Sequence, residues 1–204
     1  MDVAFRDKLF AALSKDSPGY DERRRLEGGK PASVLMLFGA SRETPSEHSL
    51  LITRRTDSVG SHKGQMAFPG GTSEPHELSA GSLGLTGTAL RETQEEIGIA
   101  STAIATIGAL PELTTITLYR VTPIVGMLRV PIEDAPLALN PFEIAEAFWV
   151  KLSVLREEGV YRTEYIRVGA VNYPIHVYLV NGHRIWGATG SMIKNLLDRL
   201  RSLG

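Results

Sequence analysis

Residues 91–99 read Arg91-Glu92-Thr93-Gln94-Glu95-Glu96-Ile97-Gly98-Ile99, and this stretch carries most of the information in the chain. On an α-helix, Glu92, Glu95 and Glu96 stand at positions i, i+3 and i+4, which brings three carboxylates together on one face. Like charges this close repel one another, and a hard divalent cation such as Mg²⁺ or Mn²⁺ neutralises them by taking their oxygens as ligands. The alternative is a solvated acidic face on which Arg91 pairs with Glu95.

The neighbouring residues indicate where this helix begins and ends. Residues 89–97 contain no glycine or proline, and Gly98 can end the helix in a left-handed cap. Residues 60–71 and 72–88 are punctuated by glycines and prolines. We therefore expect a loop, a longer loop and then the helix. The longer loop is either a mobile lid over a substrate or a tolerated surface insertion.

The rest of the chain alternates helical and extended patterns. We expect a helix from Val3 to Leu13, followed by a solvated connection that ends near residue 31. Strands are predicted within residues 33–38, 50–55, 104–130 and 145–180, and the first two of these are expected to pair. An apolar stripe at helical spacing predicts a final helix packed on the core, formed by Met192, Ile193, Leu196, Leu197, Leu200 and Leu203.

The composition limits the classes of protein to which the chain can belong. Its 204 residues, 43% of them hydrophobic, are enough for one sizeable core, and we expect a single domain over residues 1–204. A formal net charge of −1 gives no general attraction for nucleic acid or a membrane surface. The absence of cysteine excludes disulfides, thiolate metal sites and cysteine nucleophiles. No apolar run reaches the length of a signal peptide or a membrane span, so we expect a cytoplasmic protein.

The acidic helix and the glycines before it resemble the Nudix box, usually written G-x5-E-x7-R-E-U-x-E-E-x-G-U, where U is aliphatic. Gly71 and Glu77 have the spacing of its first half, and residues 91–99 follow its second half with Thr93 in the place of an aliphatic residue. Thirteen residues, 78–90, separate Glu77 from Arg91 where the family has seven. We therefore expect a six-residue insertion, located in a loop over residues 78–88, that leaves the helix carboxylates intact.

A second resemblance extends this match upstream of the box. Residues 51–56 and 62–71 are similar to the extra signature of coenzyme A diphosphatases, L-L-T-x-R-(S/A)-x3-R-x3-G-x3-F-P-G-G, with the correct spacing throughout. Ile52 and Thr56 are mild departures, whereas Gly60 replaces an arginine and so removes a phosphate contact. The tail segments 173–176 and 183–190 also resemble this group.

The resemblance implies an α/β fold, a Nudix-type α/β/α sandwich with a mixed β-sheet, that hydrolyses a nucleoside diphosphate linked to another group. It implies that Glu92, Glu95 and Glu96 are catalytic residues and ligands of Mg²⁺ or Mn²⁺, and that Gly71 offers a backbone carbonyl or a close approach to the metal. Arg91 is then a catalytic residue that orients a glutamate through a salt bridge.

Two roles stay open among several residues. The general base is Glu92 or a loop acid, with Glu143 and Glu146 as candidates. Substrate phosphate is expected to contact Arg55, His62, Lys63 and Gly70, with solvent exposure as the alternative for the first three. Arg54 and Arg55 alternate on a strand, so only one of them can face the cleft.

The remaining aromatic and histidine residues have ordinary structural interpretations. Phe142, Phe148 and Trp149 could stack on an adenine, but their spacing on a predicted strand favours the core. The histidines His48, His76 and His176 are scattered without ligand spacing, which favours surface or structural positions.

Three functions are compatible with the sequence. The first is a coenzyme A diphosphatase, supported by the two-part signature and weakened by Gly60. The second is a Nudix hydrolase of dinucleoside polyphosphates, ADP-ribose or NADH, which the insertion favours. The third is a non-catalytic nucleotide-binding module, which the intact glutamates and Arg91 disfavour. The expected partner is a small-molecule nucleotide substrate, with no nucleic acid and no membrane, and a homodimer is possible.

Overall fold

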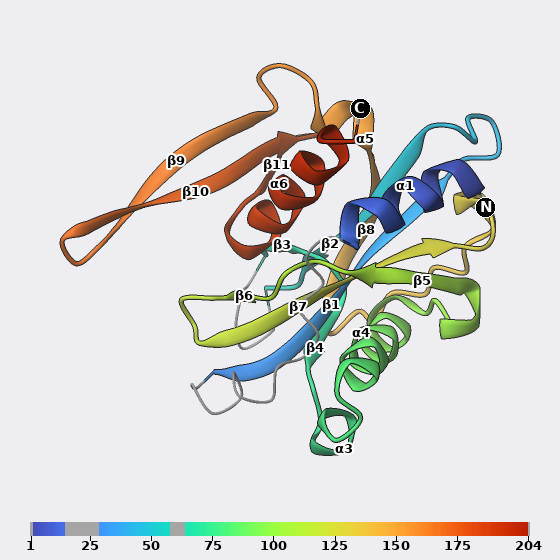
Figure 1. Cartoon of the computed structure of the whole chain (residues 1–204), viewed down its shortest axis with the longest axis horizontal. Coiled ribbons are helices and arrows are strands. Elements are labelled where there is room, and N and C mark those ends of the chain that lie inside the picture. Colours follow the sequence, from blue (N-terminus) through green and yellow to red (C-terminus); the bar gives the residue numbers. More distant parts are fainter. Residues whose placement is uncertain (1, 15–28, 58–63, 204) are drawn as a thin grey trace.

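The computed structural model describes residues 2–14, 29–57 and 64–203 of the chain. The predicted connection after the first helix falls largely outside these residues, and so do Gly60, His62 and Lys63. Within the described residues, the strands form an eight-stranded and a three-stranded sheet (Figure 1).

The larger sheet is mixed, as the resemblance to the Nudix family implies. Its main path runs in the order β3-β2-β1-β7-β5, while β4 pairs with β1, β6 with β7 and β8 with β2. Strands β1 and β7 are parallel, and the other pairs are antiparallel. Its strands are β1 (Lys30–Ala40), β2 (His48–Arg55), β3 (Met66–Ala67), β4 (Gly70–Thr72), β5 (Ile104–Ala109), β6 (Leu113–Thr114), β7 (Tyr119–Leu128) and β8 (Ile144–Lys151). The expected pairing of the first two strands is confirmed, since β1 and β2 pair antiparallel through residues 38–40 and 48–50.

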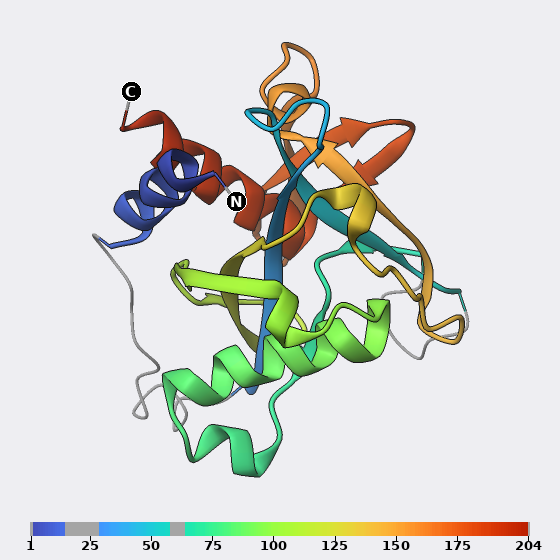
Figure 2. The same cartoon turned by 90° about the vertical axis from the view of Figure 1, so that its right-hand side faces the viewer.

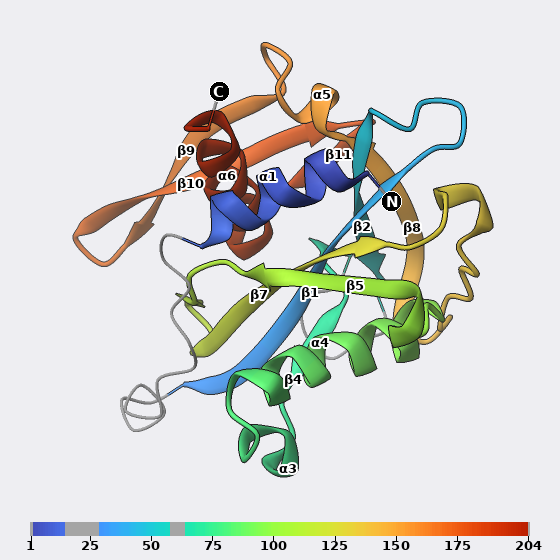
Figure 3. The same ribbon diagram turned by 45° about the vertical axis from the view of Figure 1, so that its right-hand side comes forward.

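Strand β1 is buried on both faces, which explains its continuous apolar sequence. Met36 and Phe38 belong to one core cluster, whereas Leu35 and Leu37 belong to a second cluster on the opposite face. The first cluster is shared with α1 (Val3–Leu13) and α6 (Gly187–Arg201), and the second with α4 (Ser82–Ile97). The sheet therefore lies between two helical layers (Figure 3).

The first and last helices form at the expected places. Asp2 caps α1 by accepting a hydrogen bond from the Phe5 backbone N–H at 3.1 Å. Figure 2 shows α1 beside α6. The buried side chains of α6 include Met192, Ile193, Leu196 and Leu200, so the predicted apolar stripe packs in the core.

The helix that carries the glutamates is longer than expected. It begins at Ser82 rather than at residue 89, and a short helix, α3 (Pro75–Leu78), precedes it. The loop predicted over residues 78–88 is therefore wrong for most of its length. Gly84 has a packing role, because a Cβ atom there would lie 1.6 Å from the carbonyl oxygen of Glu77, whereas Gly81 and Gly87 have open space around them. Gly84 lets the first turn of α4 cross closely over α3.

The smaller sheet projects from the body of the protein. Strands β9 (Tyr161–Val168) and β10 (Val171–Val180) form a long hairpin that follows α5 (Leu152–Leu155), and β11 (His183–Ile185) pairs with β10. Figures 1 and 3 show the far end of this hairpin extending well beyond α6. No helix among the described residues is long and apolar enough to cross a membrane.

Candidate functional site

Helix α4 presents its three glutamates at different depths. The side chain of Glu96 is 2% exposed, that of Glu92 is 17% exposed and that of Glu95 is 56% exposed. The helix ends where expected, since Gly98 adopts a φ of 78° in the left-handed region. Thr93, which stands where an aliphatic residue is common, is fully buried and donates its hydroxyl to the Ala89 carbonyl oxygen at 2.6 Å. The departure at Thr93 therefore leaves no unpaired polar group.

Glu96 is the point at which distant parts of the sequence meet. Its carboxylate accepts a hydrogen bond from Nη1 of Arg55 at 2.9 Å and another from the Gly70 backbone N–H at 3.1 Å. Burial raises the pKa of Glu96 to about 7, and the contacts with Arg55 and Gly70 only partly oppose this effect, while Glu92 and Glu143 add to it. Arg55 and Gly70, predicted to bind substrate, thus both contact a helix carboxylate.

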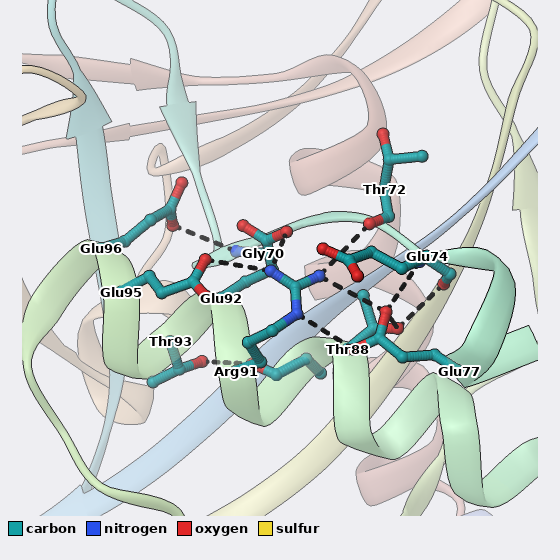
Figure 4. Close-up of polar contacts among 12 residues, drawn as sticks. Gly70, Thr72, Glu74, Glu77, Thr88, Arg91, Glu92, Thr93, Glu95 and Glu96 are labelled. Atoms are coloured by element: carbon teal, nitrogen blue, oxygen red, sulfur yellow. Dashed lines mark hydrogen bonds and ion pairs between the residues drawn. The ribbon is translucent and has the colours of Figure 1, made fainter.

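Arg91 holds the other glutamates in a single ion-pair network (Figure 4). Its Nε donates to Glu77 at 3.0 Å, and its Nη1 lies 2.9 Å from carboxylate oxygens of both Glu92 and Glu95. The hydrogen bond with Glu77 raises the pKa of Arg91 above its ordinary value. The predicted orienting salt bridge is therefore present, and it coexists with the simple Arg91–Glu95 pair considered as the alternative.

Glu77 reaches Arg91 although the interval between them is longer than in the family pattern. Its side chain is 8% exposed and accepts hydrogen bonds from the Thr88 hydroxyl and the Glu74 backbone N–H, both at 2.8 Å. Burial raises the pKa of Glu77, but the hydrogen bonds from Arg91, Glu74 and Thr88 outweigh it and lower the pKa overall. The residues between Glu77 and Arg91 include the first turns of α4, and Glu77 contacts this helix through Thr88 and Arg91.

Gly71 lies directly against the Glu92 carboxylate. A Cβ atom at this position would be 2.5 Å from the carboxyl group, so only glycine fits without displacement. Burial raises the pKa of Glu92 despite the nearby guanidinium of Arg91. The Glu92 carboxylate and the adjacent Gly71 backbone supply hard oxygen donors at a partly buried position. A divalent cation would offset the cost of burying the carboxylate.

The donor set fits such a cation in chemistry, but the side chains are not arranged around a common point. Among the residues that the structure describes, no three histidine, aspartate or glutamate side chains form a preassembled cation site. Arg91 pairs with Glu92 and Glu95, and Arg55 pairs with Glu96. In this arrangement the guanidinium groups of Arg91 and Arg55 neutralise the three carboxylates.

The two loop acids proposed as general bases lie in different places. Glu143 lies 3.6 Å from Arg55, and its charge raises the pKa of both Glu92 and Glu96. Glu146 instead pairs with Arg54 and lies 3.7 Å from Nε2 of His183. Of the two candidates, Glu143 is the acid beside the glutamates of α4.

The loop that carries Glu143 is attached to α4, a contact that the sequence does not predict. The Asn140 backbone N–H donates to the Glu96 carbonyl oxygen at 2.8 Å, and its side-chain oxygen accepts from the Phe142 backbone N–H at 3.1 Å. Thr56, which follows β2, donates its hydroxyl to the Phe142 carbonyl oxygen at 2.9 Å. Asn140-Pro141 signalled only a turn, because its long-range partner leaves no mark in the local sequence.

The three aromatic residues considered for base stacking have different environments. The core prediction is wrong for Phe142, which is 80% exposed because it lies in the turn before β8. Phe148 stacks on His183 at a ring distance of 4.9 Å, and Trp149 packs against the core cluster below α4. The structural interpretation therefore holds for Phe148 and Trp149.

Comparison with known proteins agrees with this geometry. Residues 30–167 match the family model described as NUDIX domain. The chain is 34% identical over 154 residues to Uncharacterized Nudix hydrolase NudL of Yersinia pestis (strain Pestoides F), which covers 76% of this chain and 73% of that protein. A NudL protein of Yersinia pseudotuberculosis serotype O:1b (strain IP 31758) matches to the same extent.

The fold has a counterpart among solved structures. The crystal structure of a MutT/nudix family protein from Enterococcus faecalis aligns with a TM-score of 0.53 over 99% of this chain and 70% of that chain. The two sequences are 16% identical, so this likeness concerns the fold alone.

Proposed function

The chain belongs to the NUDIX domain family, and from this premise we propose that it is a divalent-metal-dependent hydrolase that cleaves the diphosphate of coenzyme A or its derivatives. Nudix hydrolases act on nucleoside diphosphate derivatives and generally use divalent cations, so the proposal concerns the substrate and the residues that act on it.

The observation that carries the proposal is the meeting of the two halves of the sequence signature at Glu96. Arg55 belongs to the upstream part of that signature and Gly70 to its end, while Glu96 belongs to the helix half of the Nudix box. Both upstream residues donate hydrogen bonds to the Glu96 carboxylate. This contact supports the proposal, because it brings residues of both parts of the coenzyme A diphosphatase signature to one carboxylate.

We assign the cation to Glu92, Glu95, Glu96 and the backbone carbonyl of Gly71, with Mg²⁺ and Mn²⁺ as the candidate ions. When bound, such a cation neutralises the charge of the diphosphate and lowers the pKa of water at the site. Arg91 positions Glu92 and Glu95 through its Nη1, while Glu77 fixes the guanidinium from the other side.

Glu143 is the proposed general base. Its side chain is 41% exposed to solvent and lies 3.6 Å from Arg55. It is also close enough to Glu96 for its charge to raise the pKa of that residue. Arg55 then separates the charge of Glu143 from that of Glu96 and orients both carboxylates. Glu146 does not share this role, because it faces Arg54 and His183.

Phe142 is proposed to stack on the nucleobase of the substrate. Its ring is 80% exposed and directly precedes Glu143. The loop is held by Asn140 on the side of α4 and by Thr56 on the side of β2, so the ring is presented from a fixed backbone. An exposed aromatic ring on a rigid support is suited to contact the π-face of a base.

The test is a hydrolysis panel of coenzyme A, ADP-ribose, diadenosine polyphosphates and NADH with Mg²⁺ and Mn²⁺ separately, with products identified by mass. We expect coenzyme A to give the highest kcat/KM, with adenosine 3′,5′-bisphosphate and phosphopantetheine as products. Glu96→Gln should lower kcat/KM on the order of a thousandfold. Glu146→Gln is the matched control, since it makes the same change at an acid away from α4, and it should retain activity.

The outcomes separate the parts of the proposal. If ADP-ribose, NADH or a diadenosine polyphosphate gives the highest kcat/KM and Glu96→Gln abolishes it, the coenzyme A assignment is overturned and the site on α4 stands. If Glu146→Gln and Glu96→Gln lose activity equally, the placement of the site is overturned.

A further inference from the structure

The hairpin of β9 and β10 presents an open sheet edge. The strands of the smaller sheet follow the order β11-β10-β9, so β9 is its outer strand, and no strand among the described residues pairs with its other side. Figures 1 and 3 show β9 along the outer border of the projecting hairpin. An edge of this kind offers unpaired backbone groups to another strand.

The backbone groups on this edge belong to the odd-numbered residues. The Leu179 N–H donates to the Val160 carbonyl oxygen at 2.9 Å, which makes these two residues a hydrogen-bonded pair of the antiparallel hairpin. Because such pairs alternate along a ladder, Arg162 and Glu164 also direct their backbone groups toward β10. The N–H and C=O groups of Tyr161, Thr163 and Tyr165 therefore point to the open edge.

The side chains of this strand have a pattern that complements itself when reversed. Arg162 and Glu164 share one face, where the Arg162 Nε donates to the Glu164 carboxylate at 2.7 Å. Tyr161 and Tyr165 share the other face, on either side of Thr163. Tyr165 is 68% exposed, so most of its aromatic ring is free to contact a neighbouring strand. On each side of Thr163 there is first a charged residue and then a tyrosine, and the two charges have opposite signs.

We propose that two copies of this chain pair through β9, antiparallel and about a two-fold axis at Thr163. In this register Arg162 lies opposite Glu164 of the other copy, and Tyr161 lies opposite Tyr165 of the other copy. Each pair occurs twice because the interface is symmetric. In the same register, the outward N–H and C=O groups of Tyr161, Thr163 and Tyr165 can form hydrogen bonds with those of the other copy. The two hairpins then form one continuous sheet.

Neighbouring registers lack this complementarity. An axis at Arg162 places two arginines opposite each other, and an axis at Glu164 places two glutamates opposite each other. An axis at Tyr161 sets Glu164 against Glu158, and an axis at Tyr165 sets Arg162 against Val168 and Glu164 against Ile166, so that neither faces an opposite charge of the other copy. Since like charges directly opposite destabilise a sheet and unlike charges stabilise it, the axis at Thr163 is favoured.

The first test uses the absence of cysteine from the chain. Thr163→Cys places a thiol opposite its own copy, where the spacing of antiparallel strands suits a disulfide. Oxidation with diamide should therefore convert Thr163→Cys to a covalent dimer, whereas a control variant treated for the same time should stay monomeric. The control is Arg167→Cys, because two copies of residue 167 lie eight positions apart in this register, or roughly 27 Å.

The second test changes the charges and measures dimerisation by sedimentation equilibrium. Arg162→Glu and Glu164→Arg should each weaken the dimer at least tenfold, and combining them should recover most of that loss because opposite charges face each other again. Arg167→Glu, a charge reversal on the same strand, should leave the dimer unchanged. Far-UV circular dichroism checks that every variant is folded.

Each result supports or overturns the proposal. A wild-type chain that stays monomeric at all concentrations overturns it, as does a dimer that is unaffected by the single charge reversals. Equal cross-linking at positions 163 and 167 overturns the register. None of these readouts depends on hydrolysis, so failure here leaves the proposed function untouched.

Discussion

Arg54 and Arg55 are neighbours at the end of β2, yet they lie on opposite faces of the sheet and in different surroundings. Arg55 contacts Glu96 and Glu143 on the face covered by α4. Arg54 contacts Glu146 on the other face, where His183 is also close. Each arginine thus has a carboxylate partner from the chain around β8, and only one of the two assemblies includes the glutamates of α4.

The difference between the two assemblies is one of depth. Glu96 is 2% exposed, whereas Glu146 is 39% exposed. A charge pair in contact with solvent contributes little to stability, while a buried carboxylate depends on each of its partners. The two arginine–glutamate pairs therefore look alike in the sequence, but they differ in burial and so in their expected contribution to stability.

The largest expected difference between the two faces concerns the loop acids. Glu143→Gln should lower kcat on the order of a hundredfold with little change in KM, because a neutral amide cannot take a proton from the attacking water. Glu146→Gln should change kcat less than about twofold, since its contacts lie on the other face. Steady-state kinetics on the best substrate of the panel measures both. Equal losses in the two variants would contradict the assignment of the base to Glu143.

A second comparison removes the arginines themselves. Arg55→Met should lower kcat/KM roughly tenfold to a hundredfold and the free energy of unfolding by about 1–3 kcal/mol, because the buried carboxylate of Glu96 then loses its guanidinium partner. Arg54→Met should cost about 0–1 kcal/mol and keep activity, since its pair is partly solvated. Urea unfolding and kinetics test both variants. A larger stability loss for Arg54→Met would reverse the interpretation of the two faces.

The smallest expected effect is a pH dependence of the free energy of unfolding, which arises from His48 on the face of β2 that carries Arg54. His48 begins this strand, stacks on Phe5 at a ring distance of 3.7 Å and is 5% exposed. Burial lowers the pKa of His48, although the Asp2 carboxylate, 3.6 Å from Nε2, partly opposes this effect. Folded protein therefore takes up a proton at this residue less readily than unfolded protein does.

The sign of the pH effect follows from this difference in proton uptake. Above the pKa of unfolded histidine, about 6.5, His48 is neutral in both states and contributes no pH dependence. As the pH falls below that value, the unfolded chain binds the proton first, so the free energy of unfolding decreases. His48→Gln should reduce this decrease in urea unfolding measured between pH 7.5 and 5, with activity at neutral pH retained. An unchanged slope would show that His48 is not the responsible group.

Much of the fold could be predicted from the sequence because its signals are local. The helix at residues 3–13 and the strands β1 and β2 follow from the spacing of apolar residues. The main failure was the start of α4, where glycines within residues 81–87 favoured a loop. Gly84 is helical because the close crossing of α3 and α4 excludes a side chain, and that crossing is a tertiary contact.

The sequence by itself determined that three glutamates stand on one helix and that Gly98 ends it, because helical periodicity and left-handed caps depend only on nearby residues. It did not determine that Arg55 meets Glu96 across 41 positions of the chain, or that Asn140 attaches the loop of Glu143 to α4. Such contacts arise when the sheet and helix pack together. Tertiary structure decided which of two adjacent arginines, and which of two loop acids, lies beside the carboxylates, because burial and long-range pairing are properties of the packed chain.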